Sequence, residues 1–253
     1  MTAAIQKRAD MILLPGWACT AQVWAGVIPR LGEFAVPQSL DLPAAKAGKS
    51  KADLSLEHMA QQLLAAAPQR AVWVGWSLGG LIAAQAAFMA PHRVTALVLV
   101  ACTPKFVRGH DWRCAMPAGM LAEFQRSLDG DAGGTLRRFA ALCAHNGRRV
   151  DAAIARTLAH AMQSASESDC RMLAAELALL MCADLRDVFR ALTCPVLCIL
   201  GEWDPLVPIA VADALPALNP RFKILRIAGA GHAAFISHPV EFINALRDFC
   251  GGL

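Results

Sequence analysis

Gly75-Trp76-Ser77-Leu78-Gly79 is the stretch that decides the fold, and Gly80 follows it directly. A short apolar run, Ala71–Val74, precedes it, and a helix-like run, Leu81–Ala87, comes after it. Strand, Gly-x-Ser-x-Gly and helix, in that order, form the context of a nucleophile elbow, in which the serine occupies a strained turn between close-packed elements. The pattern predicts that Ser77 is a nucleophile at a helix N-terminus, where free amides favour a developing anion.

Apolar runs typical of strands alternate with helical patterns on both sides of this elbow. Strands alternating with helices imply right-handed βαβ units, so we predict an α/β fold with a mostly parallel, doubly wound sheet. Pro37 predicts an edge position for its strand because proline cannot donate to a ladder, and Ser55 is expected to cap a helix. The expected strands cover residues 11–14, 34–42, 71–74, 94–101, 195–200 and 222–227, the expected helices 22–31, 55–67, 81–90 and 239–250, and a loop 44–50.

The pattern changes after Thr103-Pro104. No convincing strand occurs from Lys105 to Arg190, whereas residues 135–143, 151–163 and 170–180 have helical spacing. Such a segment is too long for a loop. We therefore expect an α/β core of residues 1–103 and 191–253 and a helical lid of residues 104–190.

The composition of the chain excludes several classes of protein. Hydrophobic residues make up 56% of the chain, which favours a well-filled core, but no apolar run approaches the roughly 18 residues that span a membrane. The apolar run behind Lys7 and Arg8 is too short for a signal peptide. Nine cysteines are scattered without a C-x-x-C pair, which indicates buried thiols in a reducing, cytoplasmic compartment. The sequence has no cluster of Cys and His residues of the kind that binds a metal. We therefore expect neither a metal nor another cofactor.

The net charge of +4 is concentrated in one segment. Residues 134–163 contain five arginines and one acid, Asp151, so this segment alone accounts for +4. A solvated helix face is one interpretation, and a docking patch for an acidic partner is the other. A nucleic-acid partner is not expected, because no basic tail and no recognition motif occur.

A serine nucleophile needs a base to take its proton and an acid to orient that base, in the chain order Ser, Asp/Glu, His for this context. Asp204 follows the strand at 195–200 and fits the acid, with Glu202 as the competitor. His232 follows the strand at 222–227 within a glycine-rich loop and fits the base. His238 is its rival, although His238-Pro239 directly opens the last helix and favours a structural role.

Two backbone amides should hold the oxyanion of the reaction. The residue after the nucleophile, Leu78, supplies one, and the loop after the first strand supplies the other through Trp17. The Trp17 ring can also line the pocket. In this mechanism Ser77 attacks an ester carbonyl while His232 accepts its proton, and water then cleaves the acyl-enzyme.

These residues resemble the α/β-hydrolase superfamily and, within it, the pimeloyl-[acyl-carrier protein] methyl ester esterases. Trp76 inside the elbow and the segment from His232 to Pro239 are the most specific parts. Members of that group usually have His-Gly before the oxyanion tryptophan where this chain has Pro15-Gly16, a change that keeps the amide donor. The resemblance extends over segments 14–17, 41–43, 75–81, 138–142, 204–208 and 232–239.

The resemblance implies a four-helix lid and hydrolysis of the methyl ester of pimeloyl-[acyl-carrier protein] in biotin biosynthesis. It implies the acyl carrier protein as partner, docked by Arg138, Arg148, Arg149 and Arg156. We expect a monomer. The substrate-binding residues that it implies are Trp17, Trp76, Leu78, Phe139, Ala140, Ala141, Leu142 and Cys143.

Three alternatives share these motifs. A broad short-chain carboxylesterase would need no carrier partner. A lyase on the same scaffold would use Ser77 and His232 to abstract a proton. A non-catalytic binding module is disfavoured by the complete set of Ser77, Asp204 and His232.

Overall fold

The computed structural model describes residues 8–43, 55–128, 130–166 and 170–253, so the loop expected at 44–50 lies outside the described residues. In this part of the chain six strands form one sheet in the order β2-β1-β3-β4-β5-β6. Every neighbouring pair is parallel. The strands are β1 (Ala9–Leu14), β2 (Ala35–Ser39), β3 (Ala71–Trp76), β4 (Val94–Val100), β5 (Val196–Gly201) and β6 (Lys223–Ile227).

The sheet is buried at its centre and partly open at its edges. All residues of β3 and β5 are buried, whereas β2 and β6 mix buried and exposed positions. Pro37 lies in edge strand β2 opposite Met11 of β1, so the edge position predicted from proline is confirmed. The central strands therefore carry the core and direct their carboxyl ends toward one side of the molecule.

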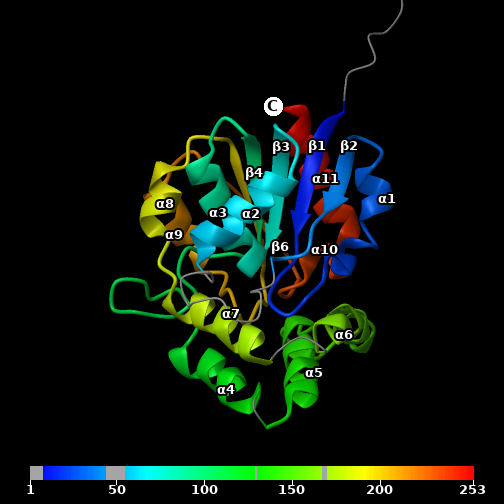
Figure 1. Ribbon diagram of the computed structural model, residues 1–253, viewed down its shortest axis with the longest axis vertical. Coiled ribbons are helices and arrows are strands. Elements are labelled where there is room, and N and C mark those ends of the chain that lie inside the picture. The colour runs from blue at the N-terminus through cyan, green and yellow to red at the C-terminus, as the bar shows by residue number, and fades with distance from the viewer. Residues whose placement is uncertain (1–7, 44–54, 129, 167–169) are drawn as a thin grey trace, which may run out of the picture.

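Helices cover both faces of the sheet (Figure 1). One set of helices in contact with each other consists of α2, α3, α8 and α9, and a second set consists of α1, α10 and α11. The Ser55 hydroxyl accepts a hydrogen bond from the His58 amide and caps α2, as predicted. These helices are α1 (Ile28–Leu31), α2 (Leu56–Ala66), α3 (Leu78–Met89), α8 (Arg186–Ala191), α9 (Val211–Leu218), α10 (Ala234–Ser237) and α11 (Pro239–Gly251).

Two parts of the core differ from the expected pattern. The single helix expected over residues 22–31 is a 3-10 turn, η1 (Ala21–Trp24), followed by the short helix α1. Pro29 lies in the first turn of α1, where its missing N–H costs no hydrogen bond. The short helices α9 and α10 were not predicted, and α9 contains Pro216.

Four of the helices in the described part of residues 104–190 lie together beyond the carboxyl end of the sheet (Figure 1), whereas α8, which also begins in this range, packs on α3 of the core. Their apolar faces pack α4 on α7 and α5 on α6. Within that part of the insertion, extended pairing is limited to isolated bridges such as Val107 with Met116. The helices are α4 (Ala118–Leu128), α5 (Ala132–Cys143), α6 (Ala152–Ser166) and α7 (Cys170–Cys182). Among the described residues, none of the helices has the length and apolarity to cross a membrane.

Candidate active site

Ser77 occupies the turn between β3 and α3. Its φ and ψ are 54° and −116°, a positive-φ conformation that is strained for a residue with a side chain. The Ser77 amide donates to the Val100 carbonyl oxygen at 2.9 Å, which ties the turn to β4. Leu78 begins α3, so its amide belongs to the first turn, where N–H groups lack partners within the helix.

Glycines let the strand, the turn and the helix approach one another. A Cβ atom at Gly75 would lie 2.4 Å from the Gly79 carbonyl oxygen, and one at Gly79 would lie 2.3 Å from the Pro15 carbonyl oxygen. Both contacts involve backbone atoms that cannot move aside cheaply. The structure therefore requires glycine at both positions, in agreement with the elbow interpretation.

Asp204 and His232 form a buried pair above the carboxyl ends of β5 and β6. Asp204 Oδ2 lies 2.8 Å from His232 Nδ1, and both side chains are fully buried. The amides of Leu206 and Val207 donate to Asp204 Oδ1 at 2.8 and 2.9 Å, which fixes the carboxylate. A carboxylate at Nδ1 favours the tautomer with the proton on Nδ1, which leaves the lone pair on Nε2.

The His232 loop rests directly against the elbow. The Trp76 indole N–H donates to the His232 carbonyl oxygen at 2.9 Å, and the two ring centroids are 5.5 Å apart. His232 Nε2 is buried and has no hydrogen-bond partner within the described residues. A hydrogen bond from Ser77 Oγ to Nε2 is thus not formed in this conformation. Catalytic hydrogen bonds are often long before substrate binds. Rotation of the Ser77 side chain changes the distance between Ser77 Oγ and His232 Nε2.

The two rival residues lie elsewhere in these loops. Glu202 is exposed and accepts a hydrogen bond from the Gly229 amide at 2.9 Å. His238 Nδ1 lies 2.8 Å from Ser237 Oγ, and His238 immediately precedes α11. The structure therefore brings Asp204, and not Glu202, to His232.

The loop after β1, residues 15–20, carries Trp17 beneath the helical insertion; we call it the β1 loop. The Trp17 indole N–H donates to the Leu173 carbonyl oxygen of α7 at 3.0 Å. Its ring meets Phe139 of α5 edge to face, with centroids 4.7 Å apart. Gly79 lies under the Pro15 carbonyl, so this loop borders the first turn of α3.

Helix α5 divides the expected acyl-binding residues between two sides. Phe139, Ala140 and Cys143 are buried toward the core. Ala141 and Leu142 are half-buried, and Leu142 lines a cavity of about 220 Å³ between α4 and α5 together with Arg138. The run 139–143 therefore does not form one continuous wall, because consecutive residues of a helix face different directions.

The four arginines expected to dock a partner are all exposed. Arg138 belongs to α5, Arg156 to α6, and Arg148 and Arg149 to the connection between these helices. The Arg138 guanidinium donates to Thr135 Oγ1 at 3.1 Å. The basic segment thus lies on the surface of the insertion.

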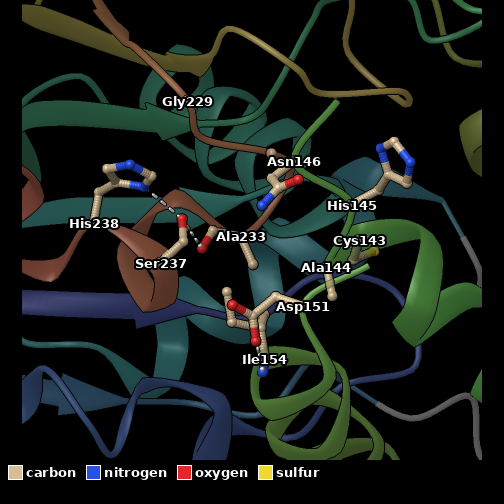
Figure 2. Close-up of a pocket in the computed structure, with 11 residues that line it drawn as sticks. Cys143, Ala144, His145, Asn146, Asp151, Ile154, Gly229, Ala233, Ser237 and His238 are labelled. Carbon is tan, nitrogen blue, oxygen red and sulfur yellow. Dashed lines mark hydrogen bonds between the residues drawn. The ribbon is translucent and has the colours of Figure 1, made fainter. Parts of the chain in front are cut away.

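The connection between α5 and α6 also packs on the loops that hold Asp204 and His232. A cavity of about 130 Å³ separates part of this connection from the segment 229–238, which includes α10 (Figure 2). Asp151 and Ile154 lie on one side of it, and Ser237 and His238 on the other (Figure 2). Its lining residues do not include Ser77, Asp204 or His232.

Burial excludes the nearby thiols as nucleophiles. Desolvation raises the pKa values of Cys19, Cys102 and Cys143 well above that of a free thiol. A thiol attacks as its thiolate, which these sites disfavour.

Glu176 was not among the predicted site residues. It is a buried carboxyl group of α7, and burial raises its pKa to about 7, whereas a hydrogen bond from the Ala18 backbone amide lowers it. Its position three residues after the buried Leu173 places it on the inner face of the helix. The sequence signal was a single acid on an apolar helix face, which is too common to be specific.

The profile of the alpha/beta hydrolase family matches residues 11–246, and the chain belongs to this family. The pimeloyl-[acyl-carrier protein] methyl ester esterase of Edwardsiella ictaluri is 40% identical over 249 residues, which cover 97% of this chain and 94% of the relative. The esterase of the same name from Photobacterium profundum is 39% identical over 241 residues, covering 95% and 94%. The crystal structure of a bromoperoxidase from Bacillus anthracis matches with a TM-score of 0.85 at 20% identity, covering 97% of this chain and 92% of that one, and supports the fold alone.

Proposed function

We propose that this chain is a serine esterase that hydrolyses the methyl ester of pimeloyl-[acyl-carrier protein]. The observation that carries the proposal is the buried pair of His232 and Asp204, 2.8 Å apart, held against Trp76 of the elbow. The relatives with this reaction in their names cover nearly the whole chain, which supports the choice of substrate.

In the proposed reaction Ser77 Oγ attacks the carbonyl carbon of the methyl ester, and His232 Nε2 takes the hydroxyl proton. The backbone amides of Trp17 and Leu78 stabilise the negative charge on the carbonyl oxygen. Asp204 orients the imidazole and stabilises its protonated form. Methanol leaves with the proton from Nε2, and water repeats the sequence on the acyl-enzyme to release the free acid.

We propose the division into a core, residues 1–103 and 191–253, and a lid, residues 104–190. Helix α8 spans the second boundary and packs on α3 and α9, so the helices of the proposed lid are α4 to α7. The contacts of Trp17 with Leu173 and Phe139 support a lid that closes over the β1 loop. Phe139 is the proposed acyl-contacting residue. The Trp76 indole N–H is bonded to the His232 loop, so we assign Trp76 to the support of that loop.

The exposed arginines Arg138, Arg148, Arg149 and Arg156 are the proposed docking surface for the acidic carrier protein. Long-range attraction between opposite charges speeds association and sets orientation. We place the reaction in the cytoplasm, as a monomer and within biotin biosynthesis. All nine cysteines are free, which supports a reducing compartment.

The test compares a carrier-linked pimeloyl methyl ester with a small carrier-free methyl ester, and methanol release is measured for both. We expect wild type to hydrolyse the carrier-linked ester and Ser77→Ala to lose this activity. Turnover of the small ester alone would replace the proposal with a broad short-chain carboxylesterase.

A paired charge reversal, Arg148→Glu with Arg149→Glu, tests the docking surface. We expect KM for the carrier-linked ester to rise about tenfold or more, with the small ester unaffected, because like charges would then face the carrier. Arg70→Glu is the matched control, since Arg70 is exposed directly before β3, at the opposite end of the sheet. Equal effects of both changes would contradict a docking role.

A further inference from the structure

The connection between α5 and α6, residues 144–151, is held in a tight turn by its own hydrogen bonds. The Asn146 amide donates to the Arg149 carbonyl oxygen at 3.1 Å. The Asn146 side-chain oxygen accepts from the amides of Arg148 and Arg149 at 3.3 and 3.1 Å. The backbone that carries two of the proposed docking arginines is therefore fixed.

Trp203, which directly precedes Asp204, packs against this connection. Gly147 has a φ of 81°, in the left-handed region that favours glycine. A Cβ atom at Gly147 would lie 2.4 Å from Cδ2 and 2.6 Å from Cγ of Trp203, so the indole ring lies against the Gly147 backbone. The Trp203 amide also donates to the Ala230 carbonyl oxygen at 2.8 Å, which holds the residue from the core side.

A second contact joins the connection to the loop of His232. A Cβ atom at Gly231 would lie 2.1 Å from the His145 carbonyl oxygen, so the two backbones are in close contact there. Gly231 directly precedes His232 in the chain. The surface of the connection therefore continues onto the core without a break at these two points.

Trp203 stays half exposed in spite of its contacts. The exposed fraction is 50% for Trp203 and 42% for Val150, a residue of the connection that forms an antiparallel bridge with His145. Six large hydrophobic side chains of the described residues are exposed, and these two belong to one small region. Single exposed hydrophobic residues are ordinary, but an immobilised indole beside fixed cations has the composition of an interface.

The charges of this region favour an acidic partner. Among the described residues, neither the Arg148 nor the Arg149 guanidinium has a hydrogen-bond or ion-pair partner. The two acids nearby are engaged with the main chain, because Asp151 accepts from the first turn of α6 and Glu202 accepts from the Gly229 amide. Tryptophan and arginine are also the residue types most enriched among binding hot spots.

We propose that Trp203 is the apolar anchor of a docking surface that crosses the boundary between the proposed lid and core, and that its partner is the acidic carrier protein. Acidic groups of the carrier pair with Arg148 and Arg149, and an apolar side chain of the carrier covers the indole ring. This inference rests on the proposed esterase function and adds a contact from the core to the arginines of the proposed lid.

The first test compares two changes that each remove a half-exposed aromatic ring. We expect Trp203→Ala to raise KM for the carrier-linked ester about tenfold or more, and to change KM and kcat for the small carrier-free ester by less than about threefold. Phe88→Ala is the matched control, because Phe88 is 48% exposed but lies at the far end of α3 from Ser77. Equal effects of the two changes, or equal losses with both esters, would overturn the proposal.

Binding measured without turnover separates docking from catalysis. In the Ser77→Ala background, we expect Trp203→Ala to raise the Kd of the carrier-linked pimeloyl methyl ester about tenfold or more, and Phe88→Ala to leave it within about twofold. Isothermal titration measures both values, and neither depends on the exact position of the Asp204 carboxylate. Unchanged affinity in the Trp203→Ala variant would overturn the proposal.

Salt distinguishes the apolar anchor from the charges beside it. Raising NaCl from about 0.05 M to about 0.5 M screens exposed charges, so the KM effect of Arg148→Glu with Arg149→Glu should shrink several-fold. The effect of Trp203→Ala should persist within about twofold, because burial of apolar area is not screened. An effect of Trp203→Ala that disappears with salt would show that it only displaces the arginines, and would overturn the anchor.

The wild-type enzyme is measured with both esters in the same series. Turnover of the small ester alone would refute the proposed carrier-linked function. Normal turnover of the carrier-linked ester, with Trp203→Ala indistinguishable from Phe88→Ala, would refute only the anchor, so the two failures are distinguishable.

Discussion

The indole N–H of Trp76 donates to the carbonyl oxygen of His232 at 2.9 Å, so the last residue of β3 holds the loop of the proposed base. Trp76 also directly precedes Ser77 along the chain. One side chain therefore links the position of Ser77 to that of the His232 imidazole, although Ser77 and His232 are far apart in sequence.

Replacement of Trp76 by phenylalanine should distinguish the contribution of the Trp76 N–H hydrogen bond from that of the packing of the ring. Trp76→Phe keeps an aromatic ring but leaves the buried His232 carbonyl without its donor. We expect a loss of about 1–3 kcal/mol in the free energy of unfolding and about tenfold in kcat. Urea denaturation and ester turnover measure the two effects.

Trp73→Phe is the control for that variant. Trp73 is buried in the same strand, but its indole nitrogen has no hydrogen-bond partner among the described residues. The change therefore removes ring area without breaking a hydrogen bond, and kcat should remain within about twofold of wild type. Equal losses of kcat in both variants would contradict the role assigned to the Trp76 N–H.

Asp204→Asn should abolish most of the activity while preserving the fold. An amide in place of the carboxylate no longer enforces the proton on His232 Nδ1, and the loss of kcat in such a case is roughly 10⁴-fold. Glu202→Gln, whose amide oxygen can still accept from Gly229, should retain kcat within about threefold. A larger effect at Glu202 than at Asp204 would reverse the assignment of the acid.

Gly79→Ala should damage the elbow itself. Its Cβ atom would lie 2.3 Å from the Pro15 carbonyl oxygen, so β1, the turn and α3 must move apart. We expect a loss of roughly 1–3 kcal/mol of stability, a lower melting temperature and a strongly reduced kcat. In contrast, Gly119→Ala in α4 meets no atom within 4 Å and should stabilise the protein by about 0.5–1 kcal/mol. A Gly79→Ala variant with wild-type activity would contradict the close packing at the elbow.

The stability of the protein should depend on the ionisation of Glu176. Its pKa in the folded protein is about 7, above the ordinary value of 4.5, so the folded state binds more protons than the unfolded state between these values. The contribution of Glu176 therefore falls as pH rises from 4.5 to about 7 and is lowest above that range.

Glu176→Gln removes this dependence. The shift corresponds to about 3 kcal/mol at most, so the variant should be more stable than wild type near pH 8 by up to that amount. The difference should vanish below about pH 4.5, and urea denaturation at several pH values measures it. A constant difference across this range would show that Glu176 does not titrate there.

The sequence was sufficient to predict the parts of the candidate site that depend on local order. The tight turn at Ser77 follows from the small residues around it, and the pairing of Asp204 with His232 follows from loops directly after two apolar strands, since parallel strands bring their carboxyl ends to one edge. The edge position of β2 followed from Pro37 alone.

The features that the sequence did not predict depend on tertiary contacts. Glu176 is buried because α7 packs against the core, and no local pattern distinguishes it from an ordinary surface acid. Leu142 faces the α4–α5 cavity because of its place on the helix surface, although a contiguous run had suggested one pocket wall. The break between η1 and α1 occurs within a segment whose composition suits one helix.

Rapid-quench mass spectrometry with the carrier-linked substrate tests the central claim most directly. Because the pimeloyl group is attached to the carrier at one end and methylated at the other, the acyl-enzyme would join both proteins covalently. We expect a transient species with the summed mass of enzyme and substrate less methanol, attached at Ser77 and absent from Ser77→Ala. Attachment at another residue, or wild-type turnover by Ser77→Ala, would contradict the assignment of Ser77 as the nucleophile.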